Sequence, residues 1–258
     1  MLRSRIIPCL LVHRGGLIKT VGFREPKYVG DPINAVKIFN EKEVDELMVL
    51  DIDATVHGKE PDFKMIEDLA AECRMPLCYG GGIKNEKQAA HIISLGVEKV
   101  ALSSALIRNP TLASSISAII GKQSLVLVLD IKKSILGRYF VYTHNGSKNT
   151  KLDPFQLASD VARHGVGEIV INSIDRDGHM NGYDVDLADQ MRRAVDTPMT
   201  VLGGAGSLDD IRNLIERFGI IGAAAGSIFV FKGRYRAVLI NYPTVTDKRA
   251  LSSGFVAA

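Results

Sequence analysis

Short apolar runs rich in β-branched residues alternate with amphipathic segments along the whole chain. Eight such runs predict strands, at Ile6–Val12, Leu47–Ile52, Pro76–Tyr79, Val100–Ser103, Leu125–Asp130, Ile169–Asn172, Met199–Leu202 and Gly222–Ala225. The segments between them predict helices, at Asp31–Asn40, Asp62–Cys73, Glu86–Leu95, Pro110–Ile120, Pro154–His164, Asp186–Ala194 and Leu208–Phe218, with Pro32, Pro110 and Pro154 in first turns. This alternation predicts an α/β protein with a parallel sheet, closed or open.

The second half of the chain repeats the first. A glycine-rich turn, a helix, a Leu-Gly-Val or Phe-Gly-Ile triplet and a short strand ending in serine occur in the same order twice. Gly81 and Gly204 lie 123 residues apart, as do Ser104 and Ser227, and Asp51 and Asp175 lie 124 apart. Two four-strand halves close into eight strands without a free edge, whereas a doubly wound sheet has no reason to repeat at this period. We therefore predict a single (β/α)8 TIM barrel with an internal half-barrel duplication.

Two segments depart from the plain repeat. The run Gly137–Thr143 predicts a small hairpin inserted in a loop after a strand, a common place for substrate contacts. After residue 231, the glycines and Pro243 leave little room for a full eighth helix. We expect the barrel over residues 1–231 and a C-terminal tail over 232–258, with a short last helix and a mobile end.

Composition narrows the class of protein. The chain has 258 residues, 46% of them hydrophobic and 24% charged, and a formal net charge of +3. These values are typical of one globular domain and do not favour nucleic-acid or membrane-surface binding, but they leave small anionic ligands open. The N-terminus lacks the features of a signal peptide, and Phe218–Phe231 is too short and too rich in Gly and Ala for a membrane span, so we expect a cytoplasmic protein.

Neither a metal nor a cofactor is implied. The three cysteines, Cys9, Cys73 and Cys78, show no CxxC spacing and have no histidine at zinc-ligand spacing. The six histidines show no HxH or HExxH pattern. His144 and His179 fall in loops expected at the top of the barrel and have a weak claim to function.

Two glycine turns offer phosphate sites. At the C-terminal face of a barrel, a glycine turn that leads into a helix presents backbone N–H groups and a positive dipole to an anion. Gly81 and Gly82 with Ser103 and Ser104 form one candidate site, and Gly203 and Gly204 with Gly226 and Ser227 form the other. The glycines could simply allow tight turns, but two equivalent turns, each paired with a serine after the next strand, favour binding. A substrate with a phosphate at each end would fit.

Carboxylates at strand ends are the candidates for proton transfer. Asp130 closes the apolar strand from Leu125, and Asp51 closes the strand from Leu47, so both are expected at the top of the barrel. Either could instead cap a loop or helix, and the strand position favours catalysis for Asp130. Lys19 and the Asp177-Gly178 loop are weaker candidates, since loop residues of these types are often solvated.

Four charged residues begin strands. Arg5, Glu46, Lys99 and Glu168 stand at the starts of the first, second, fourth and sixth predicted strands, which places two positive and two negative charges around the bottom of the barrel. Buried charges are normally paired, and the bottom of a barrel usually serves stability. From the sequence alone, the favoured interpretation is a plug of ion pairs.

The order of these motifs resembles the cyclase subunit of imidazole glycerol phosphate synthase (HisF) from residue 1 to about 231. The residues that carry the resemblance are Arg5–Leu10, Gly30–Pro32, Asp45–Leu47, Gly80–Ile83, Ser173–Gly178 and Gly203–Gly206. The resemblance implies a glutaminase partner at the barrel bottom and ammonia that crosses the barrel to a bisphosphorylated ribonucleotide at the top. It also gives the four charges a second meaning, as the family's gate at the ammonia entrance.

The chain departs from that family at the catalytic centre. The family's acid–base pair has one Asp on the fifth strand, matched by Asp130, and one on the first, where this sequence has Leu11. Leu202 replaces a phosphate-binding Ser, and Ser103 replaces an Asn. Leucine cannot transfer protons, so the imidazole-forming cyclisation should be strongly impaired.

The same departure resembles cyclase paralogues associated with surface polysaccharides, which deliver ammonia for amidination of a sugar to an acetamidino group. Lys27–Pro32 and Ala237–Pro243 resemble that branch too. We therefore expect an ammonia-channelling subunit that works with a glutaminase and a third, sugar-modifying protein. Three alternatives stay open: an authentic histidine-pathway cyclase, a non-catalytic scaffold that activates the glutaminase, and a phosphosugar isomerase, for which the charged inlet would have no use.

Overall fold

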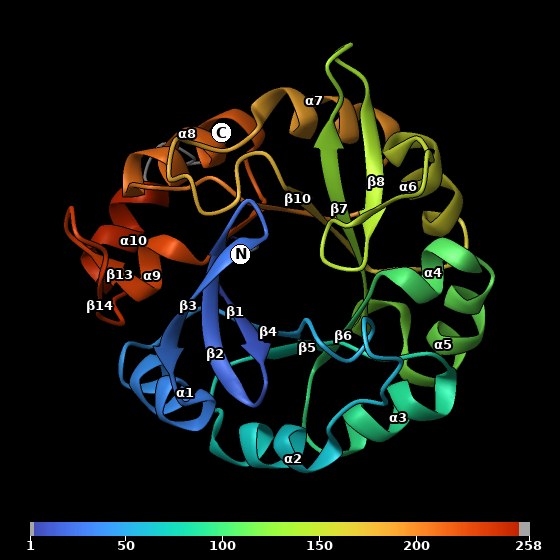
Figure 1. Ribbon diagram of the computed structural model, residues 1–258, viewed down its shortest axis with the longest axis horizontal. Helices are drawn as coiled ribbons and strands as arrows, with labels where there is room; N and C mark the ends of the chain where they lie inside the picture. Colours follow the sequence, from blue (N-terminus) through green and yellow to red (C-terminus); the bar gives the residue numbers. More distant parts are fainter. Residues whose placement is uncertain (1–2, 253–258) are drawn as a thin grey trace.

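The computed structural model describes residues 3–252, which form a closed barrel (Figure 1). Within these residues eight parallel strands make the wall: β1 (Arg5–His13), β4 (Leu47–Asp51), β5 (Leu77–Gly80), β6 (Lys99–Leu102), β7 (Leu125–Lys133), β10 (Glu168–Ser173), β11 (Met199–Leu202) and β12 (Gly222–Ala225). The wall closes because β12 pairs with both β11 and β1, and β10 pairs with both β7 and β11. The predicted TIM barrel and all eight predicted strands are confirmed.

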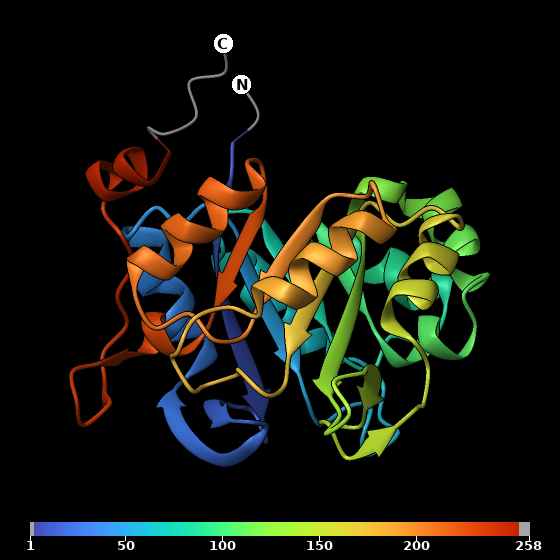
Figure 2. The same cartoon turned by 90° about the horizontal axis from the view of Figure 1, so that it is seen from above.

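Seven helices of the described chain surround the wall in a ring, as Figures 1 and 2 show. They are α1 (Pro32–Glu41), α2 (Phe63–Glu72), α3 (Glu86–Ser94), α5 (Leu112–Ile120), α6 (Pro154–Ala162), α7 (Val185–Ala194) and α8 (Leu208–Phe218). Most begin at an Asp, Asn or Ser whose side chain accepts a backbone N–H of the first turn, as Asp31 does for α1 and Ser207 for α8. Pro32 and Pro154 occupy first turns as predicted. Pro110 does not, because α5 begins only after Thr111.

The core has two parts. The larger cluster fills the space between the wall and the helices and includes Phe39, Leu69, Ile92 and Leu214. The smaller one lies inside the wall, where alternate residues of the strands point inward: Ile7, Cys9, Met48, Cys78, Ala101, Val126, Val128, Val170, Leu202 and Ala224. The barrel interior is therefore lined by apolar and small side chains between its two ends.

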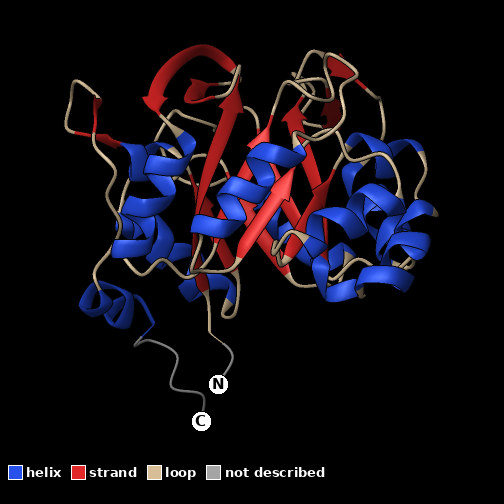
Figure 3. Ribbon diagram, turned by 90° about the horizontal axis from the view of Figure 1, so that it is seen from below, coloured by secondary structure: helices blue, strands red, loops and turns tan. Residues whose placement is uncertain are grey.

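Two antiparallel hairpins rise from one end of the barrel, opposite the chain termini (Figures 2 and 3). The predicted hairpin is present: β8 (Tyr139–Thr143) pairs with the extension of β7 and with β9 (Lys148–Asn149). The other hairpin, β2 (Gly16–Val21) and β3 (Arg24–Gly30), extends from β1 and was not predicted from the sequence. The short helices α4 (Ser104–Arg108) and α9 (Ser227–Val230) and the 3-10 turn Lys122–Ser124 were not predicted either.

The C-terminal segment contains the expected short last helix, α10 (Val245–Ser252), after a small hairpin of β13 (Phe231–Lys232) and β14 (Ala237–Val238). Tyr242 fixes this segment to the barrel, since its hydroxyl donates to Ile6 O at 2.8 Å and accepts the N–H of Asp45 at 3.1 Å. The expectation of a mobile end concerns residues 253–258, which lie outside the described residues. No helix in residues 3–252 is long and apolar enough to cross a membrane.

Candidate functional site

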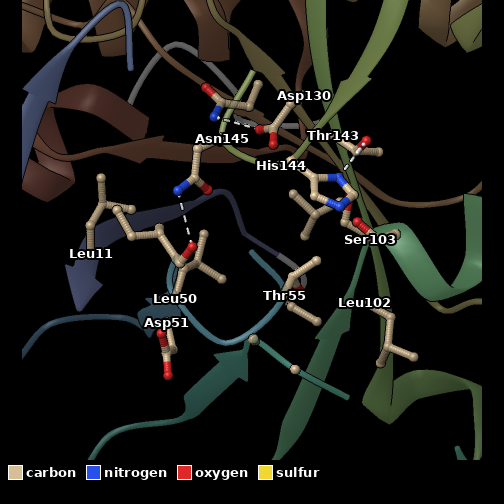
Figure 4. Close-up of a pocket in the computed structure, with 18 of the residues that line it drawn as sticks. Leu11, Leu50, Asp51, Thr55, Leu102, Ser103, Asp130, Thr143, His144 and Asn145 are labelled. Carbon is tan, nitrogen blue, oxygen red and sulfur yellow. Dashed lines mark hydrogen bonds between the residues drawn. The ribbon is translucent and has the colours of Figure 1, made fainter. Parts of the chain in front are cut away.

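A cavity of about 400 Å³ opens among the carboxyl ends of the strands, below the two hairpins. Most of the predicted top-face residues line it: Leu11, Lys19, Asp51, Gly81, Gly82, Ser103, Ser104, Asp130, Asp177, Leu202 and Gly226. Four predicted residues are not among its lining: Gly178, Gly203, Gly204 and Ser227. Figure 4 shows Asp130 on one side of the cavity and Leu11 and Leu50 on another. The site thus combines polar and apolar walls.

Asp130 reaches the cavity from β7. The side-chain N–H of Asn172, on the neighbouring strand β10, donates to Asp130 Oδ1 at 3.0 Å (Figure 4). Burial raises the pKa of Asp130 to about 7; the bond from Asn172 opposes that shift, and the charge of Asp177 adds to it. A carboxyl with this pKa exists in both protonation states near neutral pH, which suits a proton-transfer group.

Leu11 occupies the position at which the resemblance implies a second carboxylate opposite Asp130. Leu11 lies beside Leu50, its partner in the register of β1 and β4, and both side chains pack on the apolar interior of the barrel. Asp51, one residue further along β4, uses Oδ1 to accept the N–H groups of Asp53 at 2.8 Å and Ala54 at 3.1 Å. Asp51 Oδ1 therefore caps the loop after β4, which was the alternative to a catalytic role for this residue.

Lys19 and Asp177 form a buried ion pair at the edge of the cavity. The Lys19 ammonium lies 2.8 Å from Asp177 Oδ2 and 3.0 Å from Oδ1, and it also donates to Thr20 O at 2.9 Å. Only 5% of Lys19 and 6% of Asp177 is exposed, so the alternative that weakened these two candidates, solvated loop residues, fails. It failed because β2, which carries Lys19, folds back over the barrel instead of leaving it as an open loop.

The first glycine turn lies on the cavity as predicted. Gly81 has φ +130°, and a Cβ added there would lie 2.5 Å from Asp51 O, so only glycine fits between these two strand ends. Ser103 and Ser104 also line the cavity from the end of β6 and the start of α4, beside Arg108. Arg108 was not identified from the sequence, since α4 was not predicted.

The second glycine turn is covered. A Cβ on Gly204, which has φ +114°, would lie 2.2 Å from Gly182 O, and one on Gly206 would lie 2.3 Å from Met180 O. The loop between β10 and α7 therefore packs directly on this turn. In the same loop, Gly178 accepts a hydrogen bond from the Arg236 side chain at 2.8 Å, and a Cβ on Gly178 would lie 2.3 Å from Thr20 O. Ser227 is 4% exposed, and its hydroxyl has no partner within the described chain.

The turn after the predicted hairpin lines the cavity, which puts His144 in a loop at the top of the barrel as expected. His144 and Asn145, between β8 and β9, have φ values of +53° and +52°. The Asn145 side chain donates to Ile52 O at 3.0 Å, which ties the β8–β9 turn to the loop after β4 (Figure 4). A Cβ on the adjacent Gly146 would lie 3.1 Å from the Phe23 ring. These contacts could not be read from spacing, because they join segments more than 90 residues apart.

The four charged residues meet at the bottom of the barrel. Arg5 bonds Glu168 at 2.8 Å and also pairs with Glu46, while Lys99 lies 2.9 Å from both carboxylates. Burial disfavours charge on Glu168, but Arg5 and Lys99 hold its pKa below the ordinary range. The predicted plug of ion pairs is present as a closed four-residue ring, here called the charged ring, in which each carboxylate contacts both cations.

No group of three or more His, Cys, Asp or Glu residues in the described part of the chain is arranged to hold a metal ion. The cavity instead offers three carboxyl groups, those of Asp51, Asp130 and Asp177, together with two serine hydroxyls, glycine-lined turns and basic side chains. Such groups can bind an anionic organic molecule and move a proton.

Comparison with known proteins gives the family. The histidine biosynthesis protein family matches residues 5–236. A Leptospira interrogans protein named "Putative imidazole glycerol phosphate synthase subunit HisF" is 56% identical over 97% of this chain and 99% of its own length. The "Putative imidazole glycerol phosphate synthase subunit hisF2" of Pseudomonas aeruginosa is 50% identical over 95% of this chain and 98% of its own. The "Imidazole glycerol phosphate synthase subunit HisF" of Natranaerobius thermophilus is 37% identical, with coverage of 94% and 96%. The chain therefore belongs to the histidine biosynthesis protein family, as a HisF-type synthase subunit.

Proposed function

We propose that this chain is the ammonia-receiving subunit of a glutamine amidotransferase complex and serves amidination in surface-polysaccharide biosynthesis. A glutaminase docks at the bottom of the barrel, ammonia enters past the charged ring, and the top cavity holds a phosphorylated acceptor. The observation that carries the proposal is the combination of a complete charged ring at the bottom with a single acid–base residue, Asp130, at the top.

The lower half of the barrel suits an inlet. The charged ring stands at the amino ends of the strands, and the interior above it is lined by the apolar and small side chains of the inner cluster. Uncharged ammonia is compatible with such a lining, whereas ammonium would have to lose its hydration without a compensating partner. We propose Arg5, Glu46, Lys99 and Glu168 as the gate through which ammonia passes.

The upper half supplies one proton-transfer group instead of two. Asp130 can accept a proton from ammonia as its nitrogen bonds the acceptor carbon, and can pass that proton to the group that leaves the same carbon, since its raised pKa leaves both protonation states populated near pH 7. Leu11 can neither accept nor donate a proton. This arrangement favours a reaction with one proton to move, and it argues against the imidazole-forming cyclisation, which uses two carboxyl groups in the family.

The surface-polysaccharide assignment depends on resemblance. Lys27–Pro32 and Ala237–Pro243 resemble the paralogue branch that supports acetamidino-sugar formation, and Leu11 and Leu202 depart from the histidine-pathway enzymes in the same direction. In that branch a third, sugar-modifying protein takes the ammonia. We propose such a protein as the second partner of this chain, acting at the top of the barrel.

The decisive measurement is the glutaminase activity of the partner with and without this chain. We expect stimulation on addition of the purified chain, because the ring face is complete and the fold is closed. An unchanged glutaminase rate would overturn the amidotransferase proposal. The Asp130→Asn variant, altered at the other end of the barrel, should still stimulate the glutaminase and should lower product formation by the whole complex by about 10²-fold or more.

The second candidate is an authentic cyclase of histidine biosynthesis. The retained Asp130 and the 37% identity to the Natranaerobius thermophilus subunit favour it. Complementation of a histidine auxotroph that lacks its own cyclase separates the two: we expect no growth, and robust growth would refute the polysaccharide assignment. If the chain is instead a scaffold that only activates the glutaminase, Asp130→Asn will leave product formation by the complex intact.

A further inference from the structure

One element of the top face carries no acidic residue. Residues 131–152 form the extension of β7, then β8, the turn after it and β9, and they lie between the acids Asp130 and Asp153. Within this segment, here called the basic hairpin, five residues are positively charged: Lys132, Lys133, Arg138, Lys148 and Lys151. The whole chain has a formal net charge of +3, so the remainder of the chain is net negative. Positive charge is therefore concentrated on this one element.

The charges of the basic hairpin are not neutralised inside the molecule. Within residues 3–252 none of its five cations belongs to an ion pair. Lys133 lies 5.0 Å from the ring centre of Tyr139, and Arg138 lies 5.9 Å from that of Phe140. Asp175 bonds Lys133 only through the backbone N–H, at 2.8 Å. Contacts with aromatic rings leave a positive charge in place, so these side chains can pair with acidic groups of another molecule.

The tip of the basic hairpin is apolar and exposed. Ile135 is fully exposed and Leu136 is 88% exposed. Hydrogen bonds fix the turn that carries them: the N–H of Ser134 donates to Arg138 O at 2.7 Å, and the N–H of Gly137 donates to Ser134 O at 2.9 Å. Single exposed aliphatic side chains are common on protein surfaces, but two adjacent ones on a fixed turn are preorganised to enter a pocket. In Figure 1 the tip between β7 and β8 extends beyond the ring of helices.

The other end of the basic hairpin reaches the top cavity. Thr143, His144 and Asn145 line the cavity, and the Asn145 side chain bonds the loop after β4. The length of β8 separates this turn from the apolar tip by roughly 20 Å, since a strand rises about 3.3 Å per residue. A partner that covers the basic hairpin from its tip to this turn would therefore lie beside the cavity.

The extent of the charged strip favours a protein over a lipid surface as the partner. Insertion into a membrane uses apolar side chains and cations gathered at one point, whereas here the cations continue from Lys133 near the tip to Lys148 and Lys151 at β9. A strip roughly 20 Å long is comparable with one side of a protein interface, which buries about 800 Å² per partner. The complementary surface has acidic groups opposite the cations and an apolar pocket opposite Ile135 and Leu136.

We propose that the basic hairpin is the docking surface for a protein with an acidic face, whose apolar pocket takes Ile135 and Leu136. This inference rests on the proposed function, because we identify the docked protein with the third partner, which takes ammonia at the top of the barrel. Docking on this hairpin brings that partner beside the cavity that holds Asp130 and leaves the charged ring free for the glutaminase. The two partners therefore bind at opposite ends of the barrel.

The test measures binding of the purified third protein to the full chain by isothermal titration calorimetry. Leu136→Ser and Tyr235→Ser form a matched pair, because both side chains are 88% exposed but Tyr235 lies in the turn between β13 and β14. We expect Leu136→Ser to weaken binding by about tenfold or more, since it removes an aliphatic side chain that the partner buries, and Tyr235→Ser to change it by less than about twofold. The double variant Lys133→Gln/Arg138→Gln should weaken binding by about fivefold and reduce its dependence on salt concentration.

Three results would overturn the inference. The first is no binding of the third protein, or equal binding to wild type and Leu136→Ser. The second is a loss of affinity in Tyr235→Ser as large as that in Leu136→Ser. The third comes from vesicles of phosphatidylcholine and phosphatidylglycerol in equal parts: sedimentation of the wild-type chain with them that Leu136→Ser abolishes would assign the tip to a membrane.

The glutaminase assay separates this inference from the proposed function. The variants at Lys133, Leu136 and Arg138 should stimulate the glutaminase as wild type does, because they lie at the opposite end of the barrel from the charged ring. A wild-type chain that does not stimulate the glutaminase contradicts the proposed function. Normal stimulation together with equal binding of the third protein to wild type and Leu136→Ser contradicts the docking surface alone.

Discussion

Replacing Asp130 by Asn should stabilise the fold, and the gain should depend on pH. Asn keeps the size of the side chain and can still accept the hydrogen bond that Asn172 donates. It removes only the need to bury a negative charge above the pKa of Asp130, which burial raises to about 7. In the unfolded chain the same carboxyl titrates near the ordinary value of about 3.9.

The size and the pH range of the effect follow from these two values. A group whose pKa is higher in the folded state binds its proton more tightly there, so the wild-type chain loses stability as pH rises from about 4 to about 7. Above pH 7 both states are ionised and the loss is complete. One unit of pKa difference corresponds to about 1.4 kcal/mol, so the full shift sets an upper limit of about 4 kcal/mol.

Urea denaturation of both proteins at intervals from pH 4.5 to 9 measures the difference in the free energy of unfolding. The advantage of Asp130→Asn should grow up to about pH 7 and stay constant beyond it. Asp189→Asn provides a control of opposite sign, because the pKa of Asp189 is lowered by its hydrogen bond to Arg217 and the charged form is the stabilised one. A difference between Asp130→Asn and wild type that does not vary with pH would refute the reasoning.

Three further outcomes follow from the packing. Lys99→Met leaves two buried carboxylates with one cation and should lower the free energy of unfolding by roughly 3–5 kcal/mol, measured by urea denaturation at pH 7. Tyr242→Phe removes the hydroxyl that donates to Ile6 O and should cost about 1–3 kcal/mol, seen as a lower melting temperature. Gly204→Ala places a Cβ 2.2 Å from Gly182 O at a positive φ and should reduce the yield of folded protein, measured by circular dichroism and gel filtration.

The sequence was sufficient for the barrel and for its two ends. The strands follow from apolar runs of four to seven residues, and strand polarity places Asp130 at the top and Arg5 at the bottom. Closure of the sheet follows from the repeat, because the edge strands of each four-strand half can form backbone hydrogen bonds with those of the other half. These features depend on local pattern and on the direction of the chain, both of which a sequence contains.

The sequence was insufficient where distant segments meet. The pairing of Lys19 with Asp177 depends on how β2 folds back over the barrel, and the bond from Asn145 to Ile52 depends on the length and twist of β8 and β9. Equivalent glycines in the two halves also suggested equivalent sites. Spacing cannot show that Gly81 and Gly82 of the first turn line the cavity whereas Gly203 and Gly204 of the second do not.

The charged ring bears on whether small molecules can pass through the bottom of the barrel. Its formal charges cancel, and the two carboxylates, Glu46 and Glu168, are each bonded to both Arg5 and Lys99. Moving either cation aside leaves the two buried carboxylates with one cation between them, at a cost of several kcal/mol unless a replacement bond forms. If the charged ring is the gate proposed above, the isolated subunit stays closed at the bottom, and a docked protein that offers such a bond would couple its own binding to the opening of the barrel.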